Sequence, residues 1–119
     1  MASLDIESMR QKIREIAKER DWDQYHTPKN LAISLSLEAS ELLEIFQWLN
    51  DPQVAAIQND PKKMEAIRDE LSDVLYWLLR LSDVLSIDLN SAFWAKMQKN
   101  IEKYPVHLCK GKSTKYTDL

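Results

Sequence analysis

Apolar residues recur every three to four positions over most of this chain, and this spacing predicts amphipathic helices. Thr27 and Asp60 each precede a proline, which is the usual order of a helix N-cap and its first residue. Tyr104 precedes Pro105 and should end the last helix, because residues before proline avoid helical backbone angles. The prediction is an all-α, four-helix bundle with a short extended C-terminal tail. The helices are expected at about residues 4–20, 28–49, 61–86 and 89–103, and the tail at 106–119.

An acidic residue interrupts the apolar stripe of the second predicted helix. On a wheel that turns about 100° per residue, Glu38 falls about 20° from Leu31, in the middle of the stripe. Glu41 lies about 60° further round, at the edge of the stripe. Glu38 should therefore face the core. The apolar members of the stripe are Leu31, Leu35, Leu42, Ile45 and Leu49.

The third predicted helix repeats this arrangement. Glu70 and Asp73, again about 60° apart, fall within or beside the apolar arc that continues to Trp77. Burying even one ionised carboxylate without a partner costs several kcal/mol, and a group of four would repel one another. Cations or protonation must therefore compensate them. Oxygen donors at ExxE and ExxD spacing suit Mg²⁺ or Mn²⁺, which prefer hard oxygen ligands and often share them with phosphates.

Two alternatives to a metal site stay open for the acidic pairs. Acidic residues three apart are common on solvated helix faces. Ion pairs with Arg68, Arg80 or Lys96 could also neutralise the carboxylates.

Composition narrows the classes of function. The 119 residues and 13.9 kDa predict one domain, residues 1–119. The single glycine, Gly111, excludes glycine-rich phosphate loops, and the single cysteine, Cys109, fits a reducing, cytoplasmic compartment. A net charge of -3 argues against a nucleic-acid polymer as partner. The longest apolar run, 74–79, is far too short to span a membrane.

Four segments between Trp22 and the C-terminus carry a resemblance to a known family. They are Trp22 with His26-Thr27-Pro28-Lys29-Asn30-Leu31; Glu38-x-x-Glu41 with Phe46-Gln47-Trp48; Asp69-Glu70-Leu71-Ser72-Asp73-Val74-Leu75; and Lys96-Met97 with Asn100, Tyr104-Pro105, His107-Leu108 and Lys115-Tyr116-Thr117. With them the chain resembles the all-α nucleoside triphosphate pyrophosphohydrolases of the MazG type, and looks closest to their dCTP pyrophosphatase branch. Many members carry a further Glu where this chain has Leu37, and the dCTP-type branch commonly lacks it.

The resemblance implies hydrolysis of a nucleoside triphosphate between its α and β phosphates. The implied substrate is dCTP or a modified dCTP, and the implied role is house-cleaning of the nucleotide pool. Glu38, Glu41, Glu70 and Asp73 are then expected to hold Mg²⁺, with Mn²⁺ as a substitute. Such an ion neutralises the triphosphate and activates a water, and Glu41 is the candidate base that takes the proton of that water.

The resemblance also implies substrate-binding residues. Flat aromatic rings can stack on a nucleobase, whereas a lysine and an asparagine suit phosphate or sugar. Without the resemblance, the tryptophans would be read as core residues and Lys96 as a surface residue. The expected base-binding residues are Trp22, His26, Trp48 and Trp77, and those near phosphate, sugar or site entrance are Lys96, Asn100 and Tyr104.

Two further classes of function compete with a hydrolase. A di-iron bundle would need Glu-x-x-His on two helices, and neither His26 nor His107 lies three after a Glu. A non-catalytic helical oligomeric adaptor that retains a metal site is the alternative function. The third predicted helix is apolar over most of its circumference, which favours self-association. We therefore expect a homotetramer, arranged as a dimer of dimers as the resemblance implies.

Overall fold

The computed structural model describes residues 2–119, and it confirms the predicted all-α class. The described residues form six α-helices and three short 3₁₀ turns, with no strand among them. Four long helices match the predicted segments to within a few residues at each end. The helices are α1 (Ile6–Glu19), α2 (Pro28–Phe46), α3 (Asp51–Ala55), α4 (Pro61–Val84), α5 (Leu89–Lys103) and α6 (Val106–Cys109). The 3₁₀ turns lie at Asp23–Tyr25, Ile57–Asn59 and Tyr116–Asp118.

Side-chain caps set the starts of the helices that carry the acidic pairs. The Thr27 hydroxyl accepts a hydrogen bond from the Asn30 amide at 3.3 Å and begins α2. The Asp60 carboxylate accepts one from the Lys63 amide at 3.1 Å and begins α4. Each cap satisfies a backbone donor that the first helical turn leaves without a partner. The residue types before the two prolines therefore fix where both helices begin.

The C-terminal tail differs in part from the extended chain that we predicted. Val106–Cys109 forms the short helix α6, in which the amides of Cys109 and Lys110 donate to the carbonyls of Pro105 and Val106, both at 3.1 Å. Pro105 precedes this turn with φ of -58°, the angle that its ring favours. Gly111 then takes a φ of 76° and the chain leaves the helix. Proline rigidity and one glycine thus give local structure to a segment without apolar periodicity.

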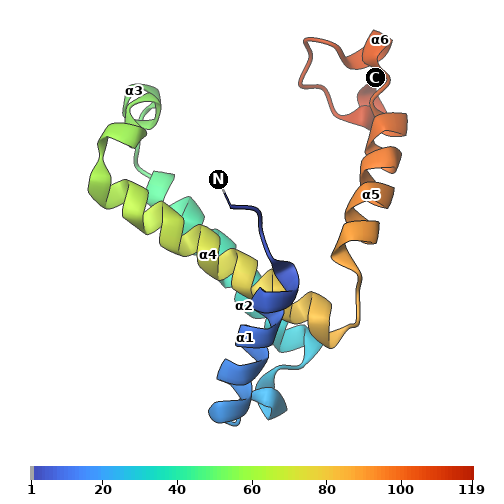
Figure 1. The fold of residues 1–119 in the computed structure, drawn as a ribbon. Coiled ribbons are helices and arrows are strands. Elements are labelled where there is room, and N and C mark those ends of the chain that lie inside the picture. The colour runs from blue at the N-terminus through green and yellow to red at the C-terminus, as the bar shows by residue number, and fades with distance from the viewer. Residues whose placement is uncertain (1) are drawn as a thin grey trace. The chain divides into compact units, whose positions relative to one another are not determined.

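The chain divides into two compact units, one up to Ser86 and the other from Ile87 to Leu119. In the first unit α2 and α4 lie side by side in opposite directions, and α1 packs on α4 (Figure 1). The buried apolar side chains of the unit come from these three helices: Ile13, Ala17, Leu31 and Leu79. The expected single domain, residues 1–119, stays a prediction.

A bidentate ion pair ties α1 to α4. The Arg14 guanidinium donates from Nε and from its terminal nitrogen to the two Asp83 oxygens, at 2.6 and 2.7 Å. This arrangement matches the planar fork of arginine to the carboxylate. The nearby guanidinium lowers the pKa of Asp83 below its ordinary value. The sequence pattern did not predict this pair.

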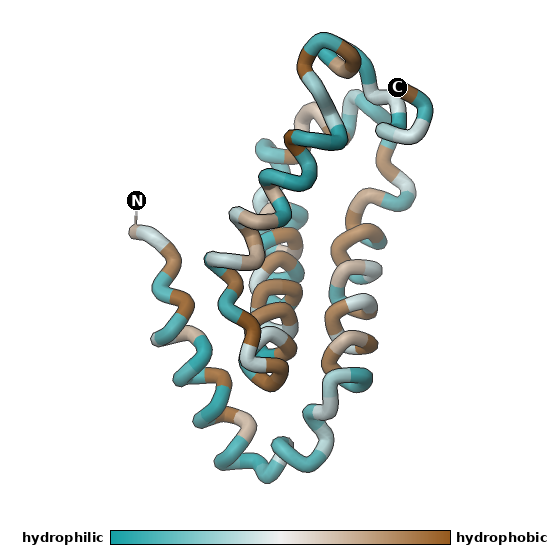
Figure 2. The backbone as a smooth tube through the Cα atoms, turned by 90° about the vertical axis from the view of Figure 1, so that its right-hand side faces the viewer, coloured by the Kyte–Doolittle hydropathy of each residue, from teal (hydrophilic) through white to brown (hydrophobic). Residues whose placement is uncertain are grey.

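The second unit contains α5, α6 and the last 3₁₀ turn. Alternating hydrophobic and hydrophilic positions run along its helices, as they do along those of the first unit (Figure 2). Tyr104 and Tyr116 meet edge to face with ring centroids 6.1 Å apart, and the Lys103 ammonium lies 4.7 Å from the centre of the Tyr116 ring. These contacts hold the end of the chain against the end of α5. Among the described residues, no helix is both long and apolar enough to cross a membrane.

Candidate functional site

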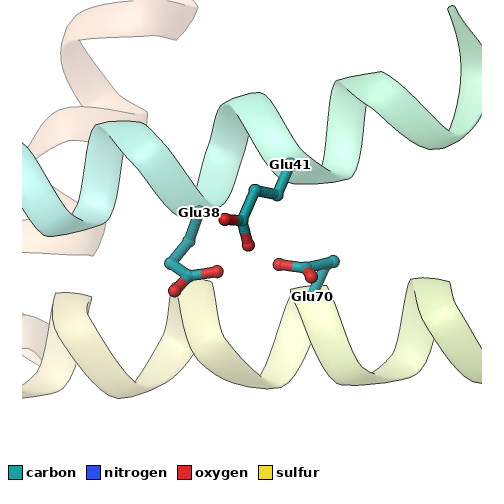
Figure 3. Close-up of side chains that lie close together, drawn as sticks. All are labelled: Glu38, Glu41 and Glu70. Atoms are coloured by element: carbon teal, nitrogen blue, oxygen red, sulfur yellow. The ribbon is translucent and has the colours of Figure 1, made fainter.

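Three of the four predicted carboxylates converge between α2 and α4. Glu38 and Glu41 extend from α2 and Glu70 from α4, so that their carboxylates face one another (Figure 3). One oxygen from each of the three lies within 4.8 Å of the others. The spacing of three residues places Glu38 and Glu41 on the same side of α2, and the pairing of the two helices supplies Glu70.

Burial leaves part of this cluster without compensation from the protein. Oε2 of Glu38 and Oε2 of Glu70 are buried and have no hydrogen-bond donor among the described residues. Glu41 is exposed at the edge of the cluster. A buried carboxylate oxygen without a donor costs free energy, and most such oxygens in native proteins have one. The cluster therefore needs a partner that the described residues do not supply.

The electrostatics of the cluster point in the same direction. Burial, and then the nearby carboxylate of Glu70, raise the pKa of Glu38 above its ordinary value. The neighbouring carboxylate of Glu38 raises the pKa of Glu41. Both shifts mean that the cluster resists carrying its full negative charge unless a cation is present.

Asp73 lies on the exposed side of α4, outside the group of three. Its negative charge still contributes to the raised pKa of Glu38. The offset of about 60° from Glu70 does not by itself explain the difference, because Glu41 has the same offset from Glu38 and still joins the group. The rotation of α4 about its own axis decides which of its carboxylates faces α2. A role for Asp73 as fourth ligand stays a prediction.

The basic residues that the sequence offers as partners do not neutralise the cluster. Arg80 donates to Asp23 at 2.7 Å, and within residues 2–119 no ion pair joins a basic side chain to Glu38, Glu41 or Glu70. Arg68 and Lys96 form no ion pair in this part of the chain. A divalent cation fits this cluster, because all its possible ligand atoms are oxygens and two of these are buried without a hydrogen-bond partner.

Three of the predicted base-binding residues lie together in the first unit. Asp21 takes a φ of 54° after the last turn of α1, and the chain then turns through Trp22 and the 3₁₀ turn to His26. The His26 ring meets Trp77 of α4 edge to face, with centroids 5.6 Å apart. The ring of Trp22, four residues before His26, also contacts the His26 ring, with a distance of 6.3 Å between the centroids.

Trp48 does not join this aromatic group. It lies just beyond α2 with 86% of its surface exposed, and it makes no ring contact within the described residues. Such exposure is unusual for a tryptophan, which rarely leaves most of its surface in water. Its expected role in base stacking stays a prediction.

The remaining predicted substrate residues belong to the second unit. Lys96 is exposed on α5, Asn100 is half-buried one turn later, and Tyr104 ends the helix. Lys96 and Asn100 lie on the same side of α5, as the spacing of four predicts. Their roles toward phosphate or sugar stay predictions.

Sequence reasoning missed the connection between Arg80 and the aromatic group. Arg80 is buried, with 7% of its surface exposed, and its Nε donates to His26 Nδ1 at 3.1 Å. The available signal was its position three residues after Trp77 in the apolar arc of α4. The sequence pattern alone suggested Arg80 only as a partner for the acidic pairs.

Comparisons with known proteins give consistent matches over most of the chain. The profile of the MazG-like family matches residues 33–119. Rat dCTP pyrophosphatase 1 is 44% identical over 114 residues, which cover 96% of this chain and 67% of that protein. Human dCTP pyrophosphatase 1 is 41% identical with the same coverage. The crystal structure of a pyrophosphatase from Archaeoglobus fulgidus superposes with a TM-score of 0.77 at 40% identity, covering 88% of this chain and 96% of that one.

Proposed function

The chain belongs to the MazG-like family, and on that premise we propose that it hydrolyses dCTP, or a modified dCTP, to the monophosphate and pyrophosphate. The observation that carries this proposal is the carboxylate cluster of Glu38, Glu41 and Glu70, in a chain so similar to dCTP pyrophosphatases. A purely structural bundle would gain stability by replacing the half-buried Glu38 with an apolar residue.

In this proposal Glu38, Glu41 and Glu70 hold Mg²⁺, and Mn²⁺ can substitute for it. The ion supplies positive charge that neutralises the triphosphate and polarises its α-phosphate. Asp73 acts as a fourth ligand at the edge of the cluster. These residues therefore fix where the reacting phosphate lies relative to α2 and α4.

Glu41 is proposed as the general base. It is the exposed member of the cluster, so solvent and substrate can reach its carboxylate. Glu41 takes a proton from the water whose oxygen attacks the α-phosphorus. The bond between the α-phosphorus and the oxygen that links it to the β-phosphorus then breaks. Pyrophosphate leaves and no covalent intermediate with the protein is formed.

The nucleotide is bound by aromatic and polar residues outside the cluster. Trp22, His26, Trp48 and Trp77 are proposed to contact the base, and Lys96, Asn100 and Tyr104 the phosphates and sugar. The chain is proposed to act as a cytoplasmic homotetramer, a dimer of dimers. Exposed leucines of α4 support self-association, and the single cysteine is consistent with a reducing compartment.

Pyrophosphate release from a panel of ribo- and deoxynucleoside triphosphates with Mg²⁺ tests the proposal. We expect release to be greatest from dCTP, and to fall at least about 100-fold in Glu41→Gln and Glu70→Gln, because general bases and metal ligands contribute at this scale. Glu65→Gln is the matched control, since Glu65 lies exposed on α4 outside the cluster. Wild-type protein that is stabilised by Mg²⁺ yet releases no pyrophosphate would instead favour the helical adaptor.

A further inference from the structure

The guanidinium of Arg80 joins α4 to the turn before α2 through two hydrogen bonds. Its terminal nitrogen donates to Asp23 Oδ1 at 2.7 Å, and its Nε donates to His26 Nδ1 at 3.1 Å. Asp23 and His26 belong to the turn before α2, whereas Arg80 belongs to α4. The ion pair with Asp23 compensates the buried guanidinium and fixes the direction of its Nε–H.

This contact determines the protonation of the His26 ring. An arginine has only donors and does not lose its proton in proteins. The Nδ1 atom that faces it must therefore be the acceptor, and in a neutral imidazole the proton then resides on Nε2. A second proton on Nδ1 would bring two N–H groups against each other. Burial and the positive charge of Arg80 lower the pKa of His26, whereas Asp23 raises it, and the net lowering agrees with a neutral ring.

The Nε2 atom of His26 is available for an external partner. It has no hydrogen-bond partner among the described residues, and it does not belong to their buried side-chain atoms that lack one, so it is accessible. The imidazole also contacts the rings of Trp22 and Trp77, with centroid distances of 6.3 and 5.6 Å. A neutral N–H donor close to two indoles suits a flat heteroaromatic ligand that presents an acceptor atom at its edge.

We propose that Arg80 is a positioning residue that holds His26 neutral with its proton on Nε2, so that His26 donates a hydrogen bond to an acceptor atom of the nucleobase. The ligand assignment rests on the proposed function, whereas the proton position does not. Arg80 itself touches no substrate. A carbonyl oxygen or an unprotonated ring nitrogen fits opposite Nε2–H, and an amino group does not, so this contact selects which edge of the base enters.

Nitrogen NMR of the histidine rings tests the proton position without any assay of activity. We expect ¹⁵N-labelled wild type at neutral pH to show His26 as a single tautomer with the proton on Nε2. His107, the other histidine, is exposed in the second unit and provides an internal reference. A proton on Nδ1 of His26 would overturn the proposal. Because the wild-type protein is enough for this measurement, the test does not depend on the folding of a variant.

The variant Arg80→Met removes both donors at similar side-chain length. In it we expect His26 to become a mixture of tautomers, and the KM for dCTP to rise about twofold with kcat unchanged, because only the fraction of rings with the proton on Nε2 can donate to the base. The matched control is Arg14→Met, which removes the bidentate guanidinium–carboxylate pair between Arg14 and Asp83. It should leave the His26 signals and KM unchanged. A fall in kcat with KM and tautomer unaltered would show a merely structural role and contradict the proposal.

Addition of dCMP to the labelled wild type separates this proposal from the proposed reaction. A shift of the His26 Nε2 signal supports the donor role, even if the panel shows no pyrophosphate release. An unshifted signal in a protein that does release pyrophosphate from dCTP would overturn the donor role and leave the reaction intact.

Discussion

Glu38 is a residue whose proposed role as a metal ligand lowers the stability of the fold when no cation is bound. Its side chain lies in the apolar stripe of α2, and its Oε2 is buried without a donor among the described residues. The nearby carboxylates of Glu70 and Asp73 raise the free-energy cost of its negative charge. Without a cation this position destabilises the fold, and with a cation it becomes a ligand.

Glu38→Gln should therefore have opposite effects on the protein with and without metal. Without divalent ions we expect a higher Tm than in wild type, because one buried negative charge is removed. With Mg²⁺ the wild type should gain about 2.7 kcal/mol at an ion concentration of 100 times Kd, and the variant much less. Thermal unfolding with EDTA and with Mg²⁺ measures both effects, and Glu65→Gln serves as control. Equal Mg²⁺ shifts in wild type and Glu38→Gln would exclude Glu38 as a ligand.

At the scale of elements, the helices follow from local signals and the contacts between them do not. Caps before Pro28 and Pro61 placed the starts of α2 and α4, and the apolar stripes placed Glu38 and Glu70 toward each other. The aromatic contacts of His26 and its bond with Arg80 depend on how α4 is rotated against the turn, which no wheel of a single helix specifies. The exposure of Asp73 depends on the same rotation, so the spacing of residues along α4 could not predict it.

The ion pair between α1 and α4 predicts a pH-dependent contribution to stability. Arg14 lowers the pKa of Asp83 in the folded state, so the unfolded state binds the proton first as the pH falls. The contribution is therefore present above the ordinary pKa of 3.8 and is lost as the pH falls through the lowered value. Asp83→Asn should lower the urea midpoint relative to wild type at pH 7, and the difference should shrink below about pH 3. A difference that stays constant with pH would show that the pair does not act through this charge.

At the scale of the whole molecule, exposed apolar surface is the feature to explain. Leu71 and Leu78 of α4 and Trp94 of α5 remain exposed, at 52%, 37% and 64%. Large apolar side chains in water favour association, and the predicted breadth of the apolar face of α4 agrees with these exposures. The assembly depends on surfaces of several copies, so one sequence could suggest association but could not specify its geometry.

Light scattering tests the homotetramer. We expect a mass four times that of the 13.9 kDa chain, and a smaller species for Leu78→Gln, because burial of an apolar side chain stabilises an interface. Lys62→Gln, a change of an exposed polar residue on α4, should keep the wild-type mass. A monomer at all concentrations of wild type would contradict the proposed assembly.

The most direct test of the central claim is the identity of the products of dCTP. Phosphorus NMR of wild type with dCTP and Mg²⁺ distinguishes cleavage after the α-phosphate from cleavage after the β-phosphate. The carboxylate cluster of α2 and α4 predicts dCMP and pyrophosphate, with no reaction after EDTA. Formation of dCDP and inorganic phosphate, or hydrolysis that persists unchanged in EDTA, would contradict the account.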